Sequence, residues 1–259
     1  EIRFPPLGEQ QRIVSILDKL SDEITNSVIQ AELNLSNSQD LFESFLAKIL
    51  DSFATSEPEY ILSELCELVV DCEHKTAPTQ DTGYPSIRTP NVGMGDLLLE
   101  GVRRVSEETY VQWTRRAIPL PNDLILTREA PAGKVGVIPD GEMVCLGQRT
   151  VLIRPKSEIF NSTFLAFLLH HPELQEKLLS HSTGATVAHV NMRDIRGLGI
   201  GTIPAIEVQE EIVNQILIVK QNSEDVRIMI QKKLDNLVEL KQSILQEAFS
   251  GKLTGGHPA

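Results

Sequence analysis

One short segment of the chain has the residue types of a metal-dependent nuclease. Asp71 is followed by Glu73, His74 and Lys75, and two carboxylates with a lysine can hold Mg²⁺ and an attacking water molecule. Such a site needs another acid on a neighbouring strand. The nearest upstream acids lie in the segment 57–59, whose Glu-Pro-Glu sequence is typical of a loop. A nuclease therefore remains an alternative with an incomplete set of ligands.

Other common enzyme signatures are incomplete as well. The glycines at 93–95 and 197–201 resemble dinucleotide-binding loops, but neither run opens a helix of a βαβ unit. The segment 132–135 lacks the hydroxyl residue and the upstream glycine of a phosphate-binding loop. Cys66, Cys72 and His74 have no second ligand pair at the spacing of a zinc site. We therefore expect no catalytic residue, no metal site and no cofactor in this chain.

The middle of the chain is rich in arginine rather than lysine. A planar guanidinium suits two-pronged hydrogen bonding to guanine edges and phosphates. Arginines of a mixed domain are also commonly solvated or paired with glutamate, and that reading stays open for each of them. The arginines in question are Arg88, Arg103, Arg104, Arg115, Arg116, Arg128, Arg149, Arg154, Arg193 and Arg196.

Composition excludes several classes of protein. The chain has 259 residues, 41% of them hydrophobic, which is enough for one large domain or two smaller ones. A net charge of −12 argues against coating nucleic acid by bulk charge, although a local basic face stays possible. No apolar run is long enough for a transmembrane helix. Three cysteines and no secretion signal indicate reduced thiols, so we expect a cytoplasmic protein.

The two ends of the chain repeat one pattern at an offset of 199 residues. Residues 5–53 align with 204–252 without gaps, so that Gln10 falls on Gln209 and Leu35 on Leu234. In both copies the spacing of apolar residues alternates between three and four, which is typical of helices that pack along a seam. Each helix follows a proline and would be about 67 Å long. The predicted pairing residues are Ile13, Leu17, Leu20, Ile24, Leu35, Ile212, Ile216, Val219, Val226, Ile230, Leu234 and Leu237.

The segment between the helices contains short β-rich runs separated by turn residues. Strands are predicted at 61–70, 124–127, 135–138 and 149–154, with one helix at 162–180. We therefore predict an α+β protein in which a mixed α/β domain is inserted between two long helices that pair as an antiparallel coiled coil. The predicted divisions are a tail and first helix at 1–54, the mixed domain at 55–202, the second helix at 203–253 and a tail at 254–259.

Five stretches of the sequence resemble the specificity (S) subunit of type I restriction-modification systems. Each is a weak match alone, but together they cover nearly the whole chain. Two departures occur: residues 206–209 read IEVQ where the first copy has adjacent Glu and Gln, and the first copy lacks the AFSG ending. The matching stretches are PPLGEQQRIV (5–14), GYPSIRTPNV (83–92), NDLILTR with GKVG (122–128, 133–136), VNMRDI with IP and EEIV (190–195, 203–204, 210–213), and QSILQEAFSGKL (242–253).

This resemblance implies a target recognition domain that reads half of a bipartite DNA site, and long helices that hold recognition domains apart. It implies double-stranded DNA, modification (methyltransferase) subunits and restriction subunits as partners, with a second copy of the chain as a further candidate. S-adenosylmethionine, Mg²⁺ and ATP would then act in the partner subunits, and this chain would be non-catalytic.

We expect DNA contacts from polar side chains in loop-like or strand-end segments of the recognition domain. Arg128→Ala is expected to weaken DNA binding without unfolding the domain. The candidate contacts are His74, Lys75, Thr76, Arg88, Asn91, Arg128, Lys134, Gln148, Arg149, Thr186, His189 and Asn191.

Two functions of other classes remain open at this point. One is a coiled-coil scaffold that never contacts DNA, and the other is the metal-dependent nuclease. Failure to bind duplex DNA together with a methyltransferase partner would favour the scaffold. Cleavage of plasmid in Mg²⁺ that is lost in Glu73→Ala would favour the nuclease.

Overall fold

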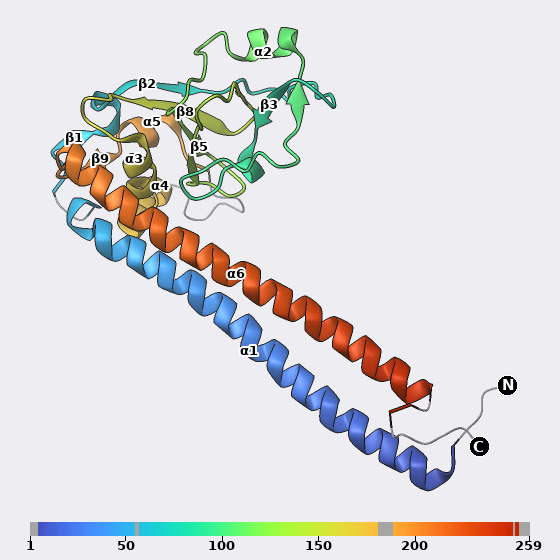
Figure 1. Cartoon of the computed structure of the whole chain (residues 1–259). Coiled ribbons are helices and arrows are strands. Elements are labelled where there is room, and N and C mark those ends of the chain that lie inside the picture. Colours follow the sequence, from blue (N-terminus) through green and yellow to red (C-terminus); the bar gives the residue numbers. More distant parts are fainter. Residues whose placement is uncertain (1–4, 55–56, 181–188, 251, 254–259) are drawn as a thin grey trace. The chain divides into compact units, whose positions relative to one another are not determined.

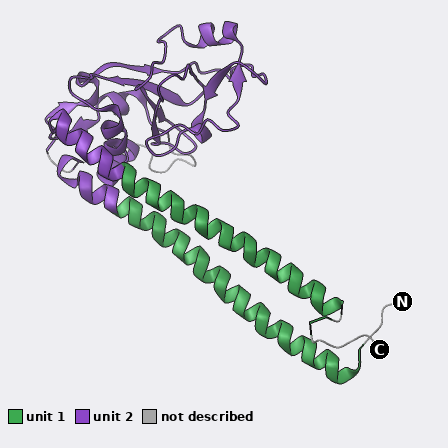
Figure 2. Ribbon diagram, in the orientation of Figure 1, with its two compact units in different colours: residues 1–44, 217–259 green, residues 45–216 purple. Residues whose placement is uncertain are grey.

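The computed structural model describes residues 5–54, 57–180, 189–250 and 252–253 (Figure 1). The chain forms two compact units (Figure 2). One consists of residues 1–44 and 217–259, and the other of residues 45–216. None of the described helices is long and apolar enough to cross a membrane.

Unit 1 is built from two long helices, α1 (Leu7–Ala54) and α6 (Ile206–Phe249), each of which also extends into unit 2. Prolines precede both helices in the sequence, where a missing N–H costs no hydrogen bond. Within unit 1 the helices run side by side in opposite directions (Figure 1). The Ser38 and Ser223 hydroxyl oxygens lie 3.1 Å apart across the pair. The predicted α+β class with an antiparallel helix pair is confirmed.

The facing surfaces of the helix pair carry small and apolar residues. Ile24, Ala31 and Phe42 are buried on α1. Most of the predicted pairing residues of unit 1 are half-buried, because two helices cover each seam residue from one side only. Val226 is exposed, and Ile212 and Ile216 are buried in unit 2. The half-buried pairing residues of unit 1 are Ile13, Leu17, Leu20, Leu35, Val219, Ile230, Leu234 and Leu237.

The described residues of unit 2 form three small sheets. The central sheet is antiparallel with strand order β2-β8-β5-β6, and the second has order β4-β3-β7 with β3 and β7 parallel. A two-stranded sheet pairs β1 with β9. The strands are β1 (Tyr60–Ile61), β2 (Cys66–Asp71), β3 (Tyr84–Ile87), β4 (Arg104–Val105), β5 (Leu124–Thr127), β6 (Val135–Val137), β7 (Cys145–Leu146), β8 (Thr150–Pro155) and β9 (Gly199–Ile200).

Short helices connect these strands. Two of the predicted elements are interrupted: a 3-10 turn separates β1 from β2, and the single helix expected at 162–180 is two helices. Pro172 is the reason for the second break, because it lacks an N–H and instead occupies the first turn of a new helix. The helical segments are η1 (Leu62–Glu64), η2 (Thr89–Asn91), α2 (Glu107–Trp113), α3 (Ser162–Leu169), α4 (Pro172–Leu179) and α5 (Met192–Arg196).

The core of unit 2 lies around the central sheet. All four residues of β5 are buried, as are six consecutive residues of α3. The backbone at Gly136 approaches another chain segment so closely that an added Cβ would lie 2.3 Å from the Asp96 carbonyl oxygen. Only glycine fits there. This packing holds the strand ends of the central sheet in fixed positions.

Candidate nucleic-acid interface

Three strands of the central sheet meet at one edge, where polar residues collect. In the antiparallel register Asp71 pairs with Val151, and Thr127 pairs with Thr150. The last residue of β2, the last residue of β5 and the first residue of β8 are therefore neighbours. The side chains that follow or precede these ends come together although they are far apart in the sequence.

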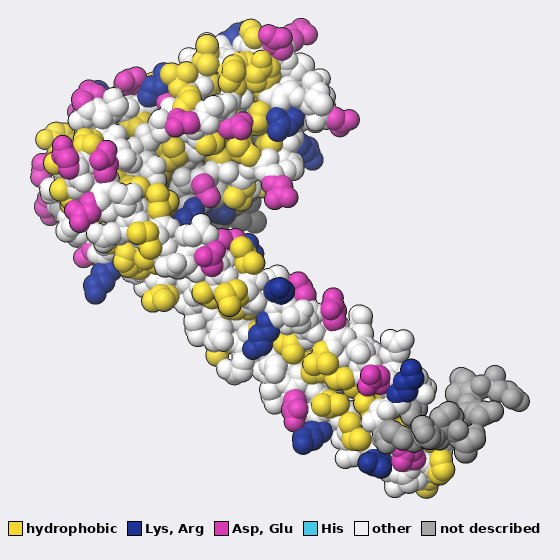
Figure 3. Space-filling view, viewed as in Figure 1, with side chains coloured by type: hydrophobic (Ala, Val, Ile, Leu, Met, Phe, Trp, Pro, Cys, Tyr) yellow, Lys and Arg dark blue, Asp and Glu magenta, His cyan; other side chains and the backbone are white. Residues whose placement is uncertain are grey.

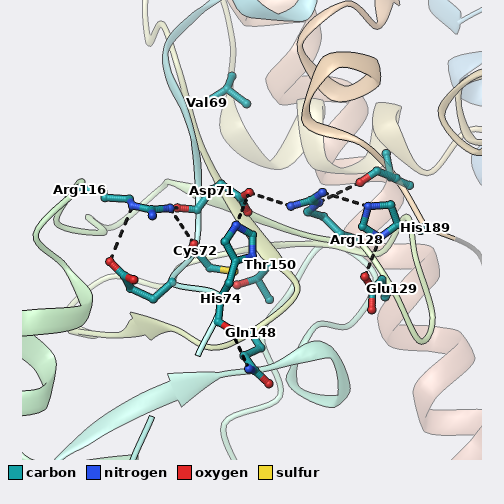
Figure 4. Close-up of polar contacts among 12 residues, drawn as sticks. Val69, Asp71, Cys72, His74, Arg116, Arg128, Glu129, Gln148, Thr150 and His189 are labelled. Atoms are coloured by element: carbon teal, nitrogen blue, oxygen red, sulfur yellow. Dashed lines mark hydrogen bonds and ion pairs between the residues drawn. The ribbon is translucent and has the colours of Figure 1, made fainter. Parts of the chain in front are cut away.

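Arg128 lies at the centre of this edge (Figure 4). Its Nη1 donates to Asp71 Oδ2 at 2.7 Å, and its Nε donates to the Val190 carbonyl oxygen at 2.8 Å. Its Nη2 lies 3.1 Å from His189 Nε2. One guanidinium thus joins the end of β2, the end of β5 and residues 189–190.

A second set of contacts continues outward from His189. Glu129 Oε1 lies 2.6 Å from His189 Nδ1, and Glu129 Oε2 lies 2.9 Å from Arg149 Nε. The Arg128 N–H also donates to the Arg149 carbonyl oxygen at 2.8 Å. Glu129 therefore holds an arginine and a histidine at neighbouring positions on the surface.

On the other side of Asp71, a short turn carries three of the predicted DNA contacts. His74 Nε2 lies 3.2 Å from Asp71 Oδ2. The Gln148 side chain donates to the His74 carbonyl oxygen at 3.2 Å and accepts from the Thr76 hydroxyl at 3.1 Å. Lys75 is exposed in the same turn. Gln148, the residue before Arg149, thus joins this turn to the segment that carries Arg149.

Together these groups form one polar network, here called the strand-end network: His74, Asp71, Arg128, His189, Glu129 and Arg149. Exposure rises from its centre to its ends. The Arg128 side chain is 10% exposed and that of Asp71 is 18% exposed. At the ends, the His74 side chain is 65% exposed and that of Arg149 is 54% exposed. The inner members hold the strands together, and the outer members can reach a ligand.

The acids that suggested a nuclease are engaged by arginines. Asp71 pairs with Arg128, and Glu73 Oε1 lies 3.6 Å from Arg115 Nη2 and 3.7 Å from Arg116 Nε. Arg116 Nη1 also donates to the backbone carbonyl of Cys72 at 2.9 Å. A catalytic Mg²⁺ would have to compete with these cations for both carboxylates, which weakens the nuclease reading.

Asp71, Cys72 and His74 present ligand atoms within 4.8 Å of one another, as a metal site would. Two features oppose a metal ion there. Arg128 already forms an ion pair with the Asp71 carboxylate. Burial raises the pKa of the Cys72 thiol, although hydrogen bonds from the backbone at Thr150 and Arg149 act in the opposite direction. A protonated thiol is a poor metal ligand, so we interpret Asp71 and His74 as members of the strand-end network rather than as metal ligands.

Among the described residues, the other predicted DNA contacts lie outside the strand-end network. The Asn91 side chain bonds to the backbone at Arg88 and Leu98, and Asn191 Nδ2 bonds to Asp194. Both side-chain amides therefore stabilise the turns in which they lie. Lys134 is exposed beside the start of β6. Thr186 lies outside the described residues.

The sequence does not predict that the acidic members of this network pair with its basic members. It predicts Asp71 only as a nuclease ligand and gives no role to Glu129. The adjacent pair Arg128-Glu129 was the available signal, but it could not show that each residue binds a partner about 60 positions away.

Solved structures with a similar fold are known. One, determined to explain complex assembly and conformational transition of the type I R-M system, superimposes with a TM-score of 0.73 at 20% identity. That match covers 96% of this chain and 61% of the other. The HsdS subunit from Thermoanaerobacter tengcongensis gives a TM-score of 0.56 at 21% identity, over 96% of this chain and 60% of that subunit. These two matches show that the fold of this chain is shared with solved structures.

The sequence leads to the same group of proteins. The family model of the type I restriction modification DNA specificity domain matches residues 59–248, so this chain belongs to that family. The specificity subunit of the type I restriction enzyme EcoBI from Escherichia coli is 24% identical over 276 residues, which cover 97% of this chain and 58% of that subunit. The chain therefore spans about three fifths of the length of the relatives it matches.

Proposed function

We propose that this chain recognises DNA sequence for a type I restriction-modification complex. The observation that carries the proposal is the strand-end network, which lies within the part of the chain that matches the specificity family. It presents exposed histidine and arginine side chains at the strand ends of the central sheet, with exposed Lys75 in the adjacent turn. This is the kind of surface that reads base edges and phosphates.

Within this proposal the chain carries no catalytic step. Methyl transfer from S-adenosylmethionine would occur in modification subunits, and cleavage with Mg²⁺ and ATP in restriction subunits. The role of this chain is to bind one half of a bipartite site and to place those subunits on it. The recognition domain would comprise residues 55–202, flanked by helices within 1–54 and 203–253.

The helix pair of unit 1 supports a role in holding protein partners. Hydrophobic side chains are exposed along it among charged ones (Figure 3). Ile218, Met229 and Leu240 are 62%, 72% and 48% exposed. They recur every 11 residues, which is close to three turns, so they share one face of α6. An apolar stripe of this kind suits the face of a partner helix, and we assign it to the modification subunit.

The test is an adenine-methylation map of DNA from cells that express this chain with the modification subunit of its own system. We expect a motif with two read parts separated by an unread gap; a palindromic motif would indicate two copies of the chain acting together. Cells with the modification subunit alone are the control and should lack the motif. No motif, together with no duplex binding by the purified pair, would contradict the proposal and favour a scaffold.

A further inference from the structure

The strand-end network separates residues that stabilise the fold from residues that can contact a ligand. Arg128 is nearly buried, and its guanidinium nitrogens contact three other residues of the protein. Arg149 has one polar side-chain contact among the described residues, the pair between its Nε and Glu129, and more than half of its side chain is exposed. Its Nη1 and Nη2 atoms are therefore available to donate to two acceptor atoms that lie in one plane.

The backbone of Arg149 is the second observation. Its φ is +68°, and among the described residues the other non-glycine residues with positive φ are Asn122 and Ala130. The left-handed region brings Cβ close to the carbonyl oxygen, so glycine or asparagine is more stable there than arginine. Hydrogen bonds impose this conformation: Arg128 N–H donates to the Arg149 carbonyl oxygen, and Thr150 Oγ1 donates to the Gly147 carbonyl oxygen.

A long cation at such a position works against the stability of the fold. The ion pair with Glu129 adds little stability, because more than half of the Arg149 side chain is exposed to solvent. Residues held in this region cluster at binding sites, where the surroundings impose the conformation and the side chain serves a ligand. Arg149 fits that description better than any other arginine of the described chain, because it alone among them has a positive φ.

We propose that Arg149 is a specificity-determining residue that donates two parallel hydrogen bonds to the N7 and O6 atoms of one guanine in the major groove. This inference rests on the proposed function and names the base class that one residue reads. Before DNA binds, Glu129 holds the guanidinium through Nε. Its two carboxylate oxygens divide between Arg149 and His189, so both side chains are placed in advance.

The test compares duplex binding by the full chain in complex with its modification subunit. The probes are duplexes that contain the motif found in the methylation map. A panel of further duplexes replaces each base pair of that motif in turn. Arg149→Asn and Arg149→Gly are the variants, since both tolerate positive φ. Arg103→Asn is the matched control, because it removes the same charge from an exposed residue of the same unit with ordinary backbone.

We expect both Arg149 variants to lose roughly tenfold to a hundredfold in affinity for the motif, with discrimination lost at a single G·C pair. The midpoint of thermal unfolding should not fall, and Arg103→Asn should bind like the parent. A uniform loss on all sequences with a weaker salt dependence would overturn the guanine assignment in favour of a phosphate contact. Unchanged affinity, or a lowered midpoint with an unchanged base profile, would also overturn it. A parent complex that binds no duplex selectively would instead contradict the proposed function.

Discussion

At the scale of the residue, the arginines of one domain divide by burial into distinct roles. Arg128 and Arg154 belong to the fold: Arg154 bonds both oxygens of the buried Asp123 at 2.7 Å, and these hydrogen bonds raise the pKa of its guanidinium. Arg149 belongs to the surface. The three side chains have the same chemistry. Only their surroundings distinguish an arginine that holds strands together from one that can contact DNA.

Burial changes the expected result for Arg128→Ala. Removing the guanidinium leaves the mostly buried Asp71 carboxylate without its cation, so we expect the free energy of unfolding to fall by about 3 kcal/mol. Urea titration monitored by circular dichroism would measure this loss. Arg103→Ala should change stability by less than about 0.5 kcal/mol, since it is a surface substitution. An Arg128→Ala protein of normal stability but weakened DNA binding would show instead that Arg128 contacts DNA directly.

At the scale of the element, the internal repeat places one glutamine in two environments. Gln209 and Gln10 each donate from Nε2 to the carbonyl oxygen of the proline five residues earlier, at 2.8 and 2.7 Å. Gln209 is fully buried, and it also donates to the Ile159 carbonyl oxygen and accepts from the Asn161 N–H. The first turn of α6 thereby fixes the loop that begins α3, and Gln10 has no such contacts among the described residues.

This difference predicts unequal effects of one substitution. Gln209→Ala leaves buried backbone groups without partners, so we expect it to lower the free energy of unfolding by about 2 kcal/mol. Gln10→Ala removes the matching bond at a half-buried position and should cost less than about 0.5 kcal/mol. Parallel urea titrations provide the comparison. Equal losses would mean that the shared bond to proline, rather than the loop contacts of Gln209, stabilises the fold.

At the scale of the whole molecule, the surface proposed for DNA recognition differs from the surface proposed for assembly. The basic and histidine side chains of the strand-end network lie in unit 2, whereas the apolar stripe of α6 lies in unit 1. Residues 1–59 carry 11 acidic and 4 basic side chains. That acidic balance disfavours DNA on the α1 surface and leaves the helix pair available to proteins.

Because the apolar stripe lies apart from the strand-end network, a substitution in the stripe should weaken binding of the modification subunit without unfolding the chain. Ile218→Glu combined with Met229→Glu places two charges on the exposed stripe, so capture of the purified modification subunit should fall more than tenfold while the helical circular dichroism signal is retained. Val238→Glu is the control, because this exposed residue lies about half a turn around the helix from Met229. If the double variant bound the subunit as well as the parent did, the stripe would not be the docking surface.

The amino-acid sequence alone determined the helical part of this protein. Alternating spacings of three and four residues, starting prolines and a repeat at constant offset are local signals, because a helix bonds to itself within four residues. Leu17 and Leu234 could therefore each be placed on the pairing face of its own helix from the sequence alone. The match of the middle segment to a recognition domain likewise needed only short motifs.

Only the tertiary structure decided which polar residues act together. Asp71, Arg128 and His189 meet because β2, β8 and β5 pair in one register, and a register depends on contacts between distant strands. The same pairing buries Arg128 and holds Arg149 at a positive φ. Neither burial nor backbone conformation can be read from an isolated arginine, because both are imposed by neighbours that the chain brings together only on folding.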